Sequence, residues 1–333
     1  MRTRQLGSSP LQFSVIGLGT WAIGGGDWLM GWGPQDESDS IAAIHKAIDL
    51  GINWIDTAAV YGEGRSEEVV GRALREMPGR QRPMIATKCG RIVSNDGVVG
   101  VIKAESIRTE CEQSLQRLGV DAIDLYQMHW PDPEEDIEEG WAEMLRLKEE
   151  GKARFIGVSN YNARQLERIR GIHPPVSVQP PYNMINRGVE DELLAYCGQH
   201  KVGIVAYSPM CKGLLTGSVS QQRVAALDRR DHRTRDPKFE GQQFDVHLSL
   251  VGGLRPIAQQ YERPLGQLAI AWVLRREEVT SAIVGARRPE QIEQTAAAGD
   301  WELSDADVVR IDALLQEHSA AMSSLGNVST GRV

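Results

Sequence analysis

Eight short runs rich in Val, Ile and aromatic residues recur along the 333-residue chain, with longer segments between them. The runs cover residues 15–19, 53–58, 84–88, 123–129, 155–160, 176–179, 203–208 and 282–286. Apolar positions recur at helical spacing in the segments 38–50, 66–76, 104–118, 137–150, 163–170 and 190–199. Strands that alternate with helices in this way predict repeated βα units and a parallel sheet.

Eight such units favour an α/β fold of the closed (β/α)8 TIM-barrel type over an open, doubly wound sheet. We expect one barrel domain over residues 1–318, with the residues before the first strand forming an N-terminal cap. The interval from Ser208 to Ala282 is much longer than the others and strongly polar around residues 229–237, which predicts a long active-site loop after the seventh strand. The Ser-, Gly- and Ala-rich residues 319–333 predict a flexible tail.

Charge and composition exclude several classes of function. The net charge is −8 and there is no long basic run, which argues against nucleic acids and anionic membranes as partners. The first residues contain no apolar signal segment and no stretch is apolar enough to span a membrane, so we expect a cytoplasmic protein. No feature of the sequence indicates an obligate protein partner, and the sequon at residues 327–329 has no secretory context.

The cysteines are far apart in the sequence and include no Cys-x-x-Cys pair. This spacing predicts neither a metal site nor a disulfide framework, so we expect free thiols at Cys89, Cys111, Cys197 and Cys211.

A glycine-rich motif, Gly-Leu-Gly-Thr-Trp-Ala at residues 17–22, follows the first run and fits the G-x-G-x-x-A dinucleotide fingerprint. A Rossmann fingerprint opens a helix, however, whereas residues 23–34 continue as Gly- and Trp-rich loop sequence. We therefore favour a tight turn at the barrel mouth. Its tryptophans are expected to line a binding cleft rather than fill the core.

Polar side chains stand at or just after the ends of three successive predicted strands. Asp56 lies near the end of the second run, Lys88 ends the third and His129 ends the fourth, and Tyr61 follows in the loop after the second run. Each has an ordinary explanation alone: a helix cap, a solvated lysine or a satisfied core histidine. Together they indicate a functional site, because a lysine at the end of a buried strand needs an anionic partner, which Asp56 supplies. A nearby ammonium group lowers the pKa of a phenol, so Tyr61 is expected to act as a general acid near neutral pH.

These four residues and five further segments resemble the aldo-keto reductase family. The segments are 62–67 (Gly-Glu-Gly-Arg-Ser-Glu), 151–160, Gln179, 207–215 and 283–287, in family order along nearly the whole chain. The branch that the chain most resembles contains bacterial reductases similar to the potassium-channel β subunits.

The resemblance implies a (β/α)8 barrel that binds NADP(H) across its mouth and reduces a small carbonyl compound to an alcohol. Tyr61 would protonate the carbonyl oxygen and His129 would orient it, with Asp56 and Lys88 in support. The carboxamide of the cofactor would be held by Ser159, Asn160 and Gln179, with Tyr207 stacked on the ring. The implied contacts to the rest of the cofactor are Gly19, Thr20, Trp21, Ser208, Pro209, Met210, Gly213, Leu214, Gly285, Arg287 and Gln291. Trp28, Trp32 and Trp130 are expected to line the substrate pocket.

The chain departs from the family pattern at Gln294-Thr295, where the family often has Glu-Asn at the adenine site. Arg287 and Arg288 fit either a phosphate clamp or a solvated helix start. Cys211 and Lys212 are expected to contribute backbone only.

Two other functions stay open beside carbonyl reduction. A cofactor-binding regulatory or sensor subunit with little turnover fits the same residues. Glycoside hydrolysis needs a second carboxyl across the cleft, where this chain has Lys88 and His129. The tryptophan-rich walls suit sugars, polyols and aldehydes alike, so the substrate is not specified.

Overall fold

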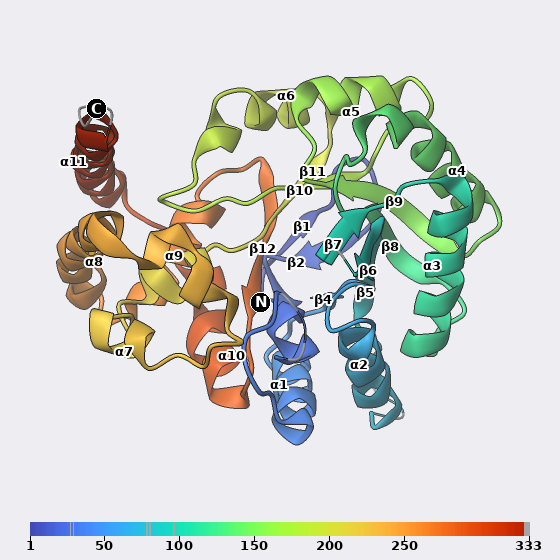
Figure 1. Ribbon diagram of the computed structural model, residues 1–333, viewed down its shortest axis with the longest axis horizontal. Helices are drawn as coiled ribbons and strands as arrows, with labels where there is room; N and C mark the ends of the chain where they lie inside the picture. Colours follow the sequence, from blue (N-terminus) through green and yellow to red (C-terminus); the bar gives the residue numbers. More distant parts are fainter. Residues whose placement is uncertain (27, 29, 78, 80, 96, 330–333) are drawn as a thin grey trace.

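In a computed structural model of the protein, residues 1–329 are described except for positions 27, 29, 78, 80 and 96. Eight parallel strands close into a barrel in the order β3-β4-β5-β8-β9-β10-β11-β12 (Figure 1). They are β3 Ile16–Gly19, β4 Trp54–Asp56, β5 Met84–Cys89, β8 Ile123–Met128, β9 Ala153–Ser159, β10 Ser177–Gln179, β11 Gly203–Ala206 and β12 Val279–Gly285. Each overlaps one of the eight expected runs, although β9 and β12 begin two and three residues earlier than expected, and the TIM-barrel prediction is confirmed.

Helices surround the barrel (Figure 1). Those between and after the strands are α1 Glu37–Asp49, α2 Arg65–Arg75, α3 Ala104–Leu118, α4 Ile137–Glu149, α5 Ala163–Arg170, α6 Leu193–His200, α9 Leu265–Leu274 and α10 Pro289–Ala296. Asp36 caps α1, because its carboxylate accepts hydrogen bonds from the backbone N–H groups of Ser38 and Asp39. Helix α2 begins after Gly64, and Ser66 is buried within its first turn.

The N-terminal end of the barrel is closed by the expected cap, a hairpin of β1 Thr3–Gln5 and β2 Gln12–Ser14. Phe13 of this hairpin stacks on Trp54 of β4, with ring centroids 4.5 Å apart, and Leu6 is fully buried beside them. Burial of these apolar groups plugs one end of the barrel. A binding site is therefore confined to the opposite end, where the strands end at their carboxyl termini.

The interval after β11 contains more helix than a loop. It holds η4 Cys211–Thr216, α7 Gln221–Ala225, η5 His232–Arg235, η6 Pro237–Phe239 and α8 Gly241–Gln260, and it ends in α9. Every residue of α9 is buried, which is typical of a helix that is apolar on all faces. The irregular part of the expected loop therefore covers only the stretch up to residue 240.

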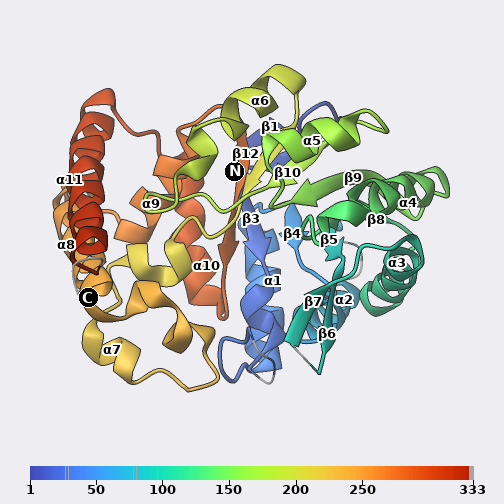
Figure 2. The same cartoon turned by 45° about the horizontal axis from the view of Figure 1, so that its top comes forward.

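Two further elements extend or interrupt the expected pattern. Helix α11 Asp305–Ser329 packs on α8 at one flank and continues past residue 318 (Figures 1 and 2). The first part of the expected tail is thus helical, and residues 330–333 lie outside the described residues. A hairpin of β6 Arg91–Ser94 and β7 Gly97–Gly100 follows β5 directly and was not predicted. Within the described residues, no helix is both long and apolar enough to span a membrane.

Candidate active site

The carboxyl ends of β4, β5 and β8 bring the expected catalytic residues together. Strands β4 and β5 pair in parallel, as do β5 and β8, where Lys88 lies opposite Gln127. Asp56 is the last residue of β4, Lys88 lies near the end of β5 and His129 follows β8. Because parallel strands end at the same edge of a barrel, these side chains share one mouth with Tyr61 from the loop after β4.

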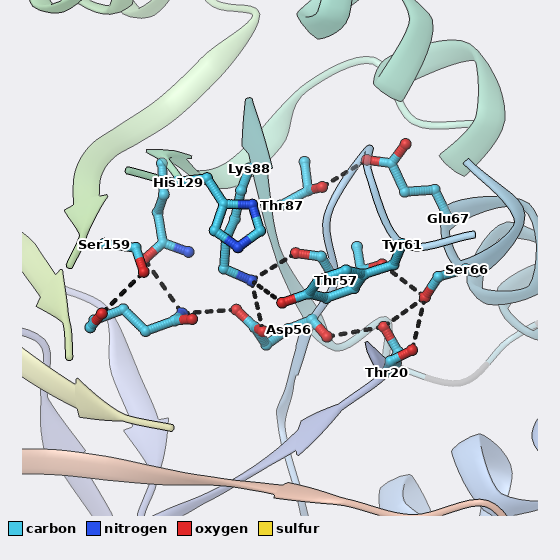
Figure 3. Close-up of polar contacts among 12 residues, drawn as sticks. Thr20, Asp56, Thr57, Tyr61, Ser66, Glu67, Thr87, Lys88, His129 and Ser159 are labelled. Carbon is cyan, nitrogen blue, oxygen red and sulfur yellow. Dashed lines mark hydrogen bonds and ion pairs between the residues drawn. The ribbon is translucent and has the colours of Figure 1, made fainter. Parts of the chain in front are cut away.

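The Lys88 ammonium group lies between Asp56 and Tyr61 (Figure 3). Its Nζ donates to Asp56 Oδ2 at 2.7 Å and to the carbonyl oxygen of Thr57 at 2.8 Å, and it lies 3.4 Å from the Tyr61 hydroxyl. Gln179 Nε2 donates to Asp56 Oδ1 at 2.8 Å. The buried lysine thus has the anionic partner that its burial requires.

Burial raises the pKa of Tyr61 well above its usual range, and the negative charge of Asp56 raises it further. We expected the charge of Lys88 to bring the net pKa of Tyr61 below its ordinary value, and that net direction was wrong. The ammonium charge is largely compensated by the closer Asp56 carboxylate, so desolvation of the phenolate dominates. Without a ligand in the cleft, Tyr61 therefore keeps its proton at neutral pH, as a proton donor must.

His129 is a neutral imidazole beside this group. Burial lowers its pKa well below the usual range, and the positive charges of Lys88 and Arg91 lower it further. Its ring meets the Tyr61 ring edge to face, with centroids 5.7 Å apart. A neutral imidazole has one N–H group to donate, so His129 can bind an oxygen in the cleft without a formal charge.

The loop that carries Tyr61 is held by close backbone contacts. Gly62 has a φ of +61°, and a Cβ at this position would lie 2.2 Å from the carbonyl oxygen of Gly24. The Ser66 backbone N–H donates to the carbonyl oxygen of Tyr61 at 3.2 Å. The Ser66 hydroxyl reaches Thr20 Oγ1 at 2.8 Å, which ties α2 to the end of β3. Ser66 therefore helps to fix Tyr61.

Glu67 is a fully buried carboxylate behind Lys88. It accepts a hydrogen bond from Thr87 Oγ1 at 2.5 Å (Figure 3). It accepts another from Arg117 Nε at 2.7 Å. These contacts join α2, β5 and α3, so Glu67 holds the helix after the Tyr61 loop against the residue that precedes Lys88.

A cleft of about 1120 Å³ runs across this mouth. Most of the residues expected at the site line it, namely Gly19, Trp21, Trp28, Trp32, Asp56, Tyr61, His129, Trp130, Ser159, Asn160, Gln179, Tyr207, Ser208, Pro209, Met210, Gly213, Gly285, Arg287 and Gln291. Lys88, Thr20 and Leu214 do not line it and are buried behind the wall. We call the region around Tyr61 and His129 the catalytic end.

The residues expected at the carboxamide site form a hydrogen-bonded group beside the catalytic end. Asn160 Nδ2 donates to the carbonyl oxygen of His129 at 2.9 Å and to Ser159 Oγ at 3.0 Å. The Tyr207 hydroxyl donates to Asn160 Oδ1 at 2.9 Å, and Ser159 Oγ donates to the carbonyl oxygen of Gln179 at 2.9 Å. Strand ends β9, β10 and β11 thus present one connected polar surface.

The segment after β11 turns sharply along the cleft. Ser208, Cys211, Lys212 and Gly213 all have positive φ, at 53°, 48°, 55° and 92°. Cys211 is buried, and Lys212 Nζ pairs with Asp236 at 2.7 Å. The Lys212 ammonium group therefore already has an anionic partner.

Four arginines, Arg223, Arg233, Arg287 and Arg288, also line the cleft, and we call their region the arginine-rich end. Arg287 is partly buried there and is not free. Its guanidinium donates to the carbonyl oxygens of Trp32 at 3.1 Å and of Pro34, and to Gln35 Oε1 at 2.5 Å. It therefore holds the loop between η1 Trp21–Gly24 and α1.

His232, which sequence reasoning missed, joins that loop to the segment after β11. Its ring stacks on Trp21 and meets Trp32 edge to face, each with centroids 4.7 Å apart. Its backbone N–H donates to the carbonyl oxygen of Gly31 at 2.9 Å. The Trp21 and Trp28 rings lie 6.3 Å from the Tyr61 ring, so the loop also brings aromatic groups to the catalytic end.

The unpredicted β6–β7 hairpin adds Arg91 and Val98 to the cleft wall. A sequence signal for it exists, because Ile92-Val93 and Val98-Val99 flank a polar turn that includes Gly97. All four cysteines are buried free thiols. Among the described residues, no group of three or more His, Cys, Asp or Glu side chains is placed to hold a metal ion.

Comparison with known proteins gives a consistent result. The model of the Aldo/keto reductase family matches residues 15–316. The chain is 39% identical over 317 residues to aldo-keto reductase YhdN of Bacillus subtilis, covering 95% of this chain and 94% of that protein. It is 34% identical to the NADH-specific methylglyoxal reductase of Escherichia coli, covering 97% and 99% of the two chains.

A solved structure agrees with these relatives. The glycerol dehydrogenase AKR11B4 from Gluconobacter oxydans superposes with a TM-score of 0.85 at 37% identity, covering 95% of each chain. The match of fold, sequence and length extends over nearly the whole barrel. The chain therefore belongs to the aldo/keto reductase family.

Proposed function

We propose that this protein is an NADP(H)-dependent oxidoreductase that interconverts small aldehydes or ketones and alcohols. The observation that carries the proposal is the position of the Tyr61 hydroxyl, 3.4 Å from Lys88 Nζ, on the wall of the cleft. A phenol that keeps its proton, beside a lysine and a neutral histidine, is suited to protonate a carbonyl oxygen.

The cleft fits a nicotinamide dinucleotide in size and chemistry. Ligand pockets usually measure ~300 to 1,000 Å³, and this cleft is slightly larger at about 1120 Å³. Ser159, Asn160 and Gln179 would hold the carboxamide, and Tyr207 would stack on the ring. Residues 208–214 would lie along the pyrophosphate. When bound, the cofactor supplies or accepts the hydride.

The residues of the catalytic end would orient the substrate and transfer the proton. His129 would donate its N–H to the substrate oxygen and so place it near Tyr61. Tyr61 would give its proton to that oxygen in reduction and take it back in oxidation. Lys88 would stabilise the phenolate left behind, while Asp56 fixes the ammonium position.

The preference for NADP(H) rests on the arginine-rich end, because guanidinium groups bind phosphate through charge-assisted hydrogen bonds. Arg287 would have to exchange its contacts with Trp32 and Pro34 for the phosphate, whereas Arg288 is exposed. The Escherichia coli relative is named as NADH-specific, so the preference is tested separately from the reaction.

A screen of aldehydes, ketones and polyols in both directions, followed by the absorbance of the reduced nicotinamide, tests the reaction. We expect turnover with several small carbonyl compounds. Tight NADPH binding without turnover of any of them would favour the regulatory subunit instead.

A further inference from the structure

Arg91 differs from two other cations that line the cleft, Lys212 and Arg233. It is the first residue of β6, two positions after the end of β5, and its side chain is 20% exposed. Lys212 and Arg233, which also line the cleft, are paired with Asp236 and Asp231 through buried or nearly buried carboxylates. Arg91 has no such partner, because its ion pair is with a half-exposed residue.

That ion pair involves only one nitrogen atom of the Arg91 guanidinium. Arg91 Nη1 lies 2.6 Å from Asp132 Oδ2, and the Asp132 side chain is 54% exposed and does not line the cleft. An ion pair so open to solvent contributes little stability. A guanidinium has five N–H groups, and the other nitrogens of Arg91 donate to no described residue. The group is packed against Trp130, with its central carbon 5.5 Å from the ring centroid.

The surroundings make Arg91 the available charge at the catalytic end. Among the described residues, the carboxylates that line the cleft are Asp36, Asp39 and Asp56. Asp36 and Asp39 belong to the start of α1, and Asp56 is saturated by Lys88 and Gln179. Arg91 is close enough to His129 for its charge to contribute to the lowered pKa of that imidazole. Arg91, His129 and Trp130 all line the cleft, so the guanidinium lies on the same wall as the histidine.

We propose that Arg91 is a specificity-determining residue that binds a carboxylate of the substrate, so that the preferred substrates are carbonyl compounds that also carry a carboxylate. The inference rests on the proposed function and names its substrate class. A planar carboxylate can accept two parallel hydrogen bonds from the guanidinium while Trp130 covers the apolar part of the substrate. An uncharged aldehyde of the same shape lacks this contact.

Matched substrates test the assignment. The catalytic efficiency kcat/KM is compared for 4-carboxybenzaldehyde and for its uncharged amide, 4-formylbenzamide, with NADPH saturating. We expect the wild type to prefer the acid by about tenfold, the size of a partly screened charge-assisted hydrogen bond. Arg91→Met should abolish this preference, mainly by raising KM for the acid, with a much smaller change in kcat/KM for the amide, while Arg91→Lys restores part of the preference. Arg164→Met, at a surface arginine of α5, is the matched control.

Asp132→Asn supplies a second test with the opposite sign. Removing the carboxylate that competes for Arg91 should raise the acid-to-amide ratio above that of the wild type. Equal losses on both substrates in Arg91→Met, or a lower ratio in Asp132→Asn, would show that Arg91 only holds the hairpin and would overturn the proposal.

A binding measurement separates this inference from the proposed function. Calorimetric titration of the NADPH complex with 4-methylbenzoate and 4-methylbenzamide needs no turnover. Loss of 4-methylbenzoate binding in Arg91→Met, with neither aldehyde reduced by the wild type, would support the carboxylate site and reject the reductase. Equal 4-methylbenzoate binding by both proteins would overturn the carboxylate site whatever the activity.

Discussion

The two ends of the cleft are built differently. At the catalytic end, Asp56, Lys88 and His129 come from or directly after buried strands and bind one another or Tyr61. At the arginine-rich end, Arg287 binds the carbonyl oxygens of the loop after η1. The barrel itself thus fixes the groups for proton transfer, whereas contacts between loops fix the groups proposed for the phosphate. Substitutions at the two ends should therefore separate chemistry from binding.

The largest expected effect is at the catalytic end. Tyr61→Phe removes the transferable proton and should lower kcat by about 10² to 10⁴, the usual contribution of general acid catalysis. NADPH affinity should stay nearly intact, as measured by fluorescence titration. Tyr196→Phe is the control, because that hydroxyl binds Glu167 on the outer surface, and its kcat should not change.

Glu67, the buried carboxylate behind the catalytic end, should contribute strongly to the stability of the fold. Glu67→Ala leaves Arg117 without its buried partner and should lower the free energy of unfolding by about 3 to 5 kcal/mol, as measured in urea. Glu68→Ala, at the exposed neighbour in the same helix, should change it by no more than ~0.5 kcal/mol. Similar values for the two variants would mean that Glu67 does not brace the site.

Lys88→Met tests the coupling between lysine and tyrosine. In alcohol oxidation Tyr61 acts as a base and must be deprotonated, and loss of the nearby cation disfavours the phenolate. The pKa of Tyr61 should then rise further, so the pH profile of oxidation should move to higher pH by about one unit. An unchanged profile in a folded variant that still binds NADPH would remove Lys88 from the mechanism.

The smallest effect is expected at the arginine-rich end. Arg287→Ala should weaken NADPH binding by about tenfold and NADH binding less, because the charge-assisted bond to a solvent-facing phosphate is screened. The dissociation constants of both cofactors, measured in wild type and variant, test whether Arg287 binds the phosphate. Equal weakening of both would assign Arg287 to the loop after η1 alone, and a wild type that prefers NADH would refute the phosphate assignment.

The sequence predicts the catalytic end better than the arginine-rich end for a physical reason. Apolar runs locate the strands, and a polar residue near the carboxyl end of such a run lies at the barrel mouth or directly behind its wall, as Asp56 and Lys88 do. The partners of Arg287 are backbone carbonyls about 250 residues away in the chain, and no local pattern indicates them. The direction of the Tyr61 pKa was also missed, because it depends on burial and on the distance between Lys88 and Asp56.

Helix α9 and the β6–β7 hairpin were missed for a different reason. The local signals exist in both, since α9 is apolar on all faces and Val98-Val99 mirrors Ile92-Val93 across a turn. The alternation of strands and helices nevertheless completes a barrel of eight βα units without either element, so neither was needed for the prediction. Regular repeats therefore obscure elements inserted between their members, and here one of these insertions carries Arg91.

Single-turnover hydride transfer in Tyr61→Phe tests the central claim most directly, because cofactor release can limit steady-state turnover and hide a slower chemical step. Enzyme saturated with NADPH is mixed with an excess of aldehyde, and the loss of reduced-nicotinamide absorbance is followed in wild type and variant. We expect the rate constant to fall by about 10² or more while the NADPH dissociation constant is unchanged. A variant that transfers hydride at more than about a tenth of the wild-type rate would show that Tyr61 is not the proton donor.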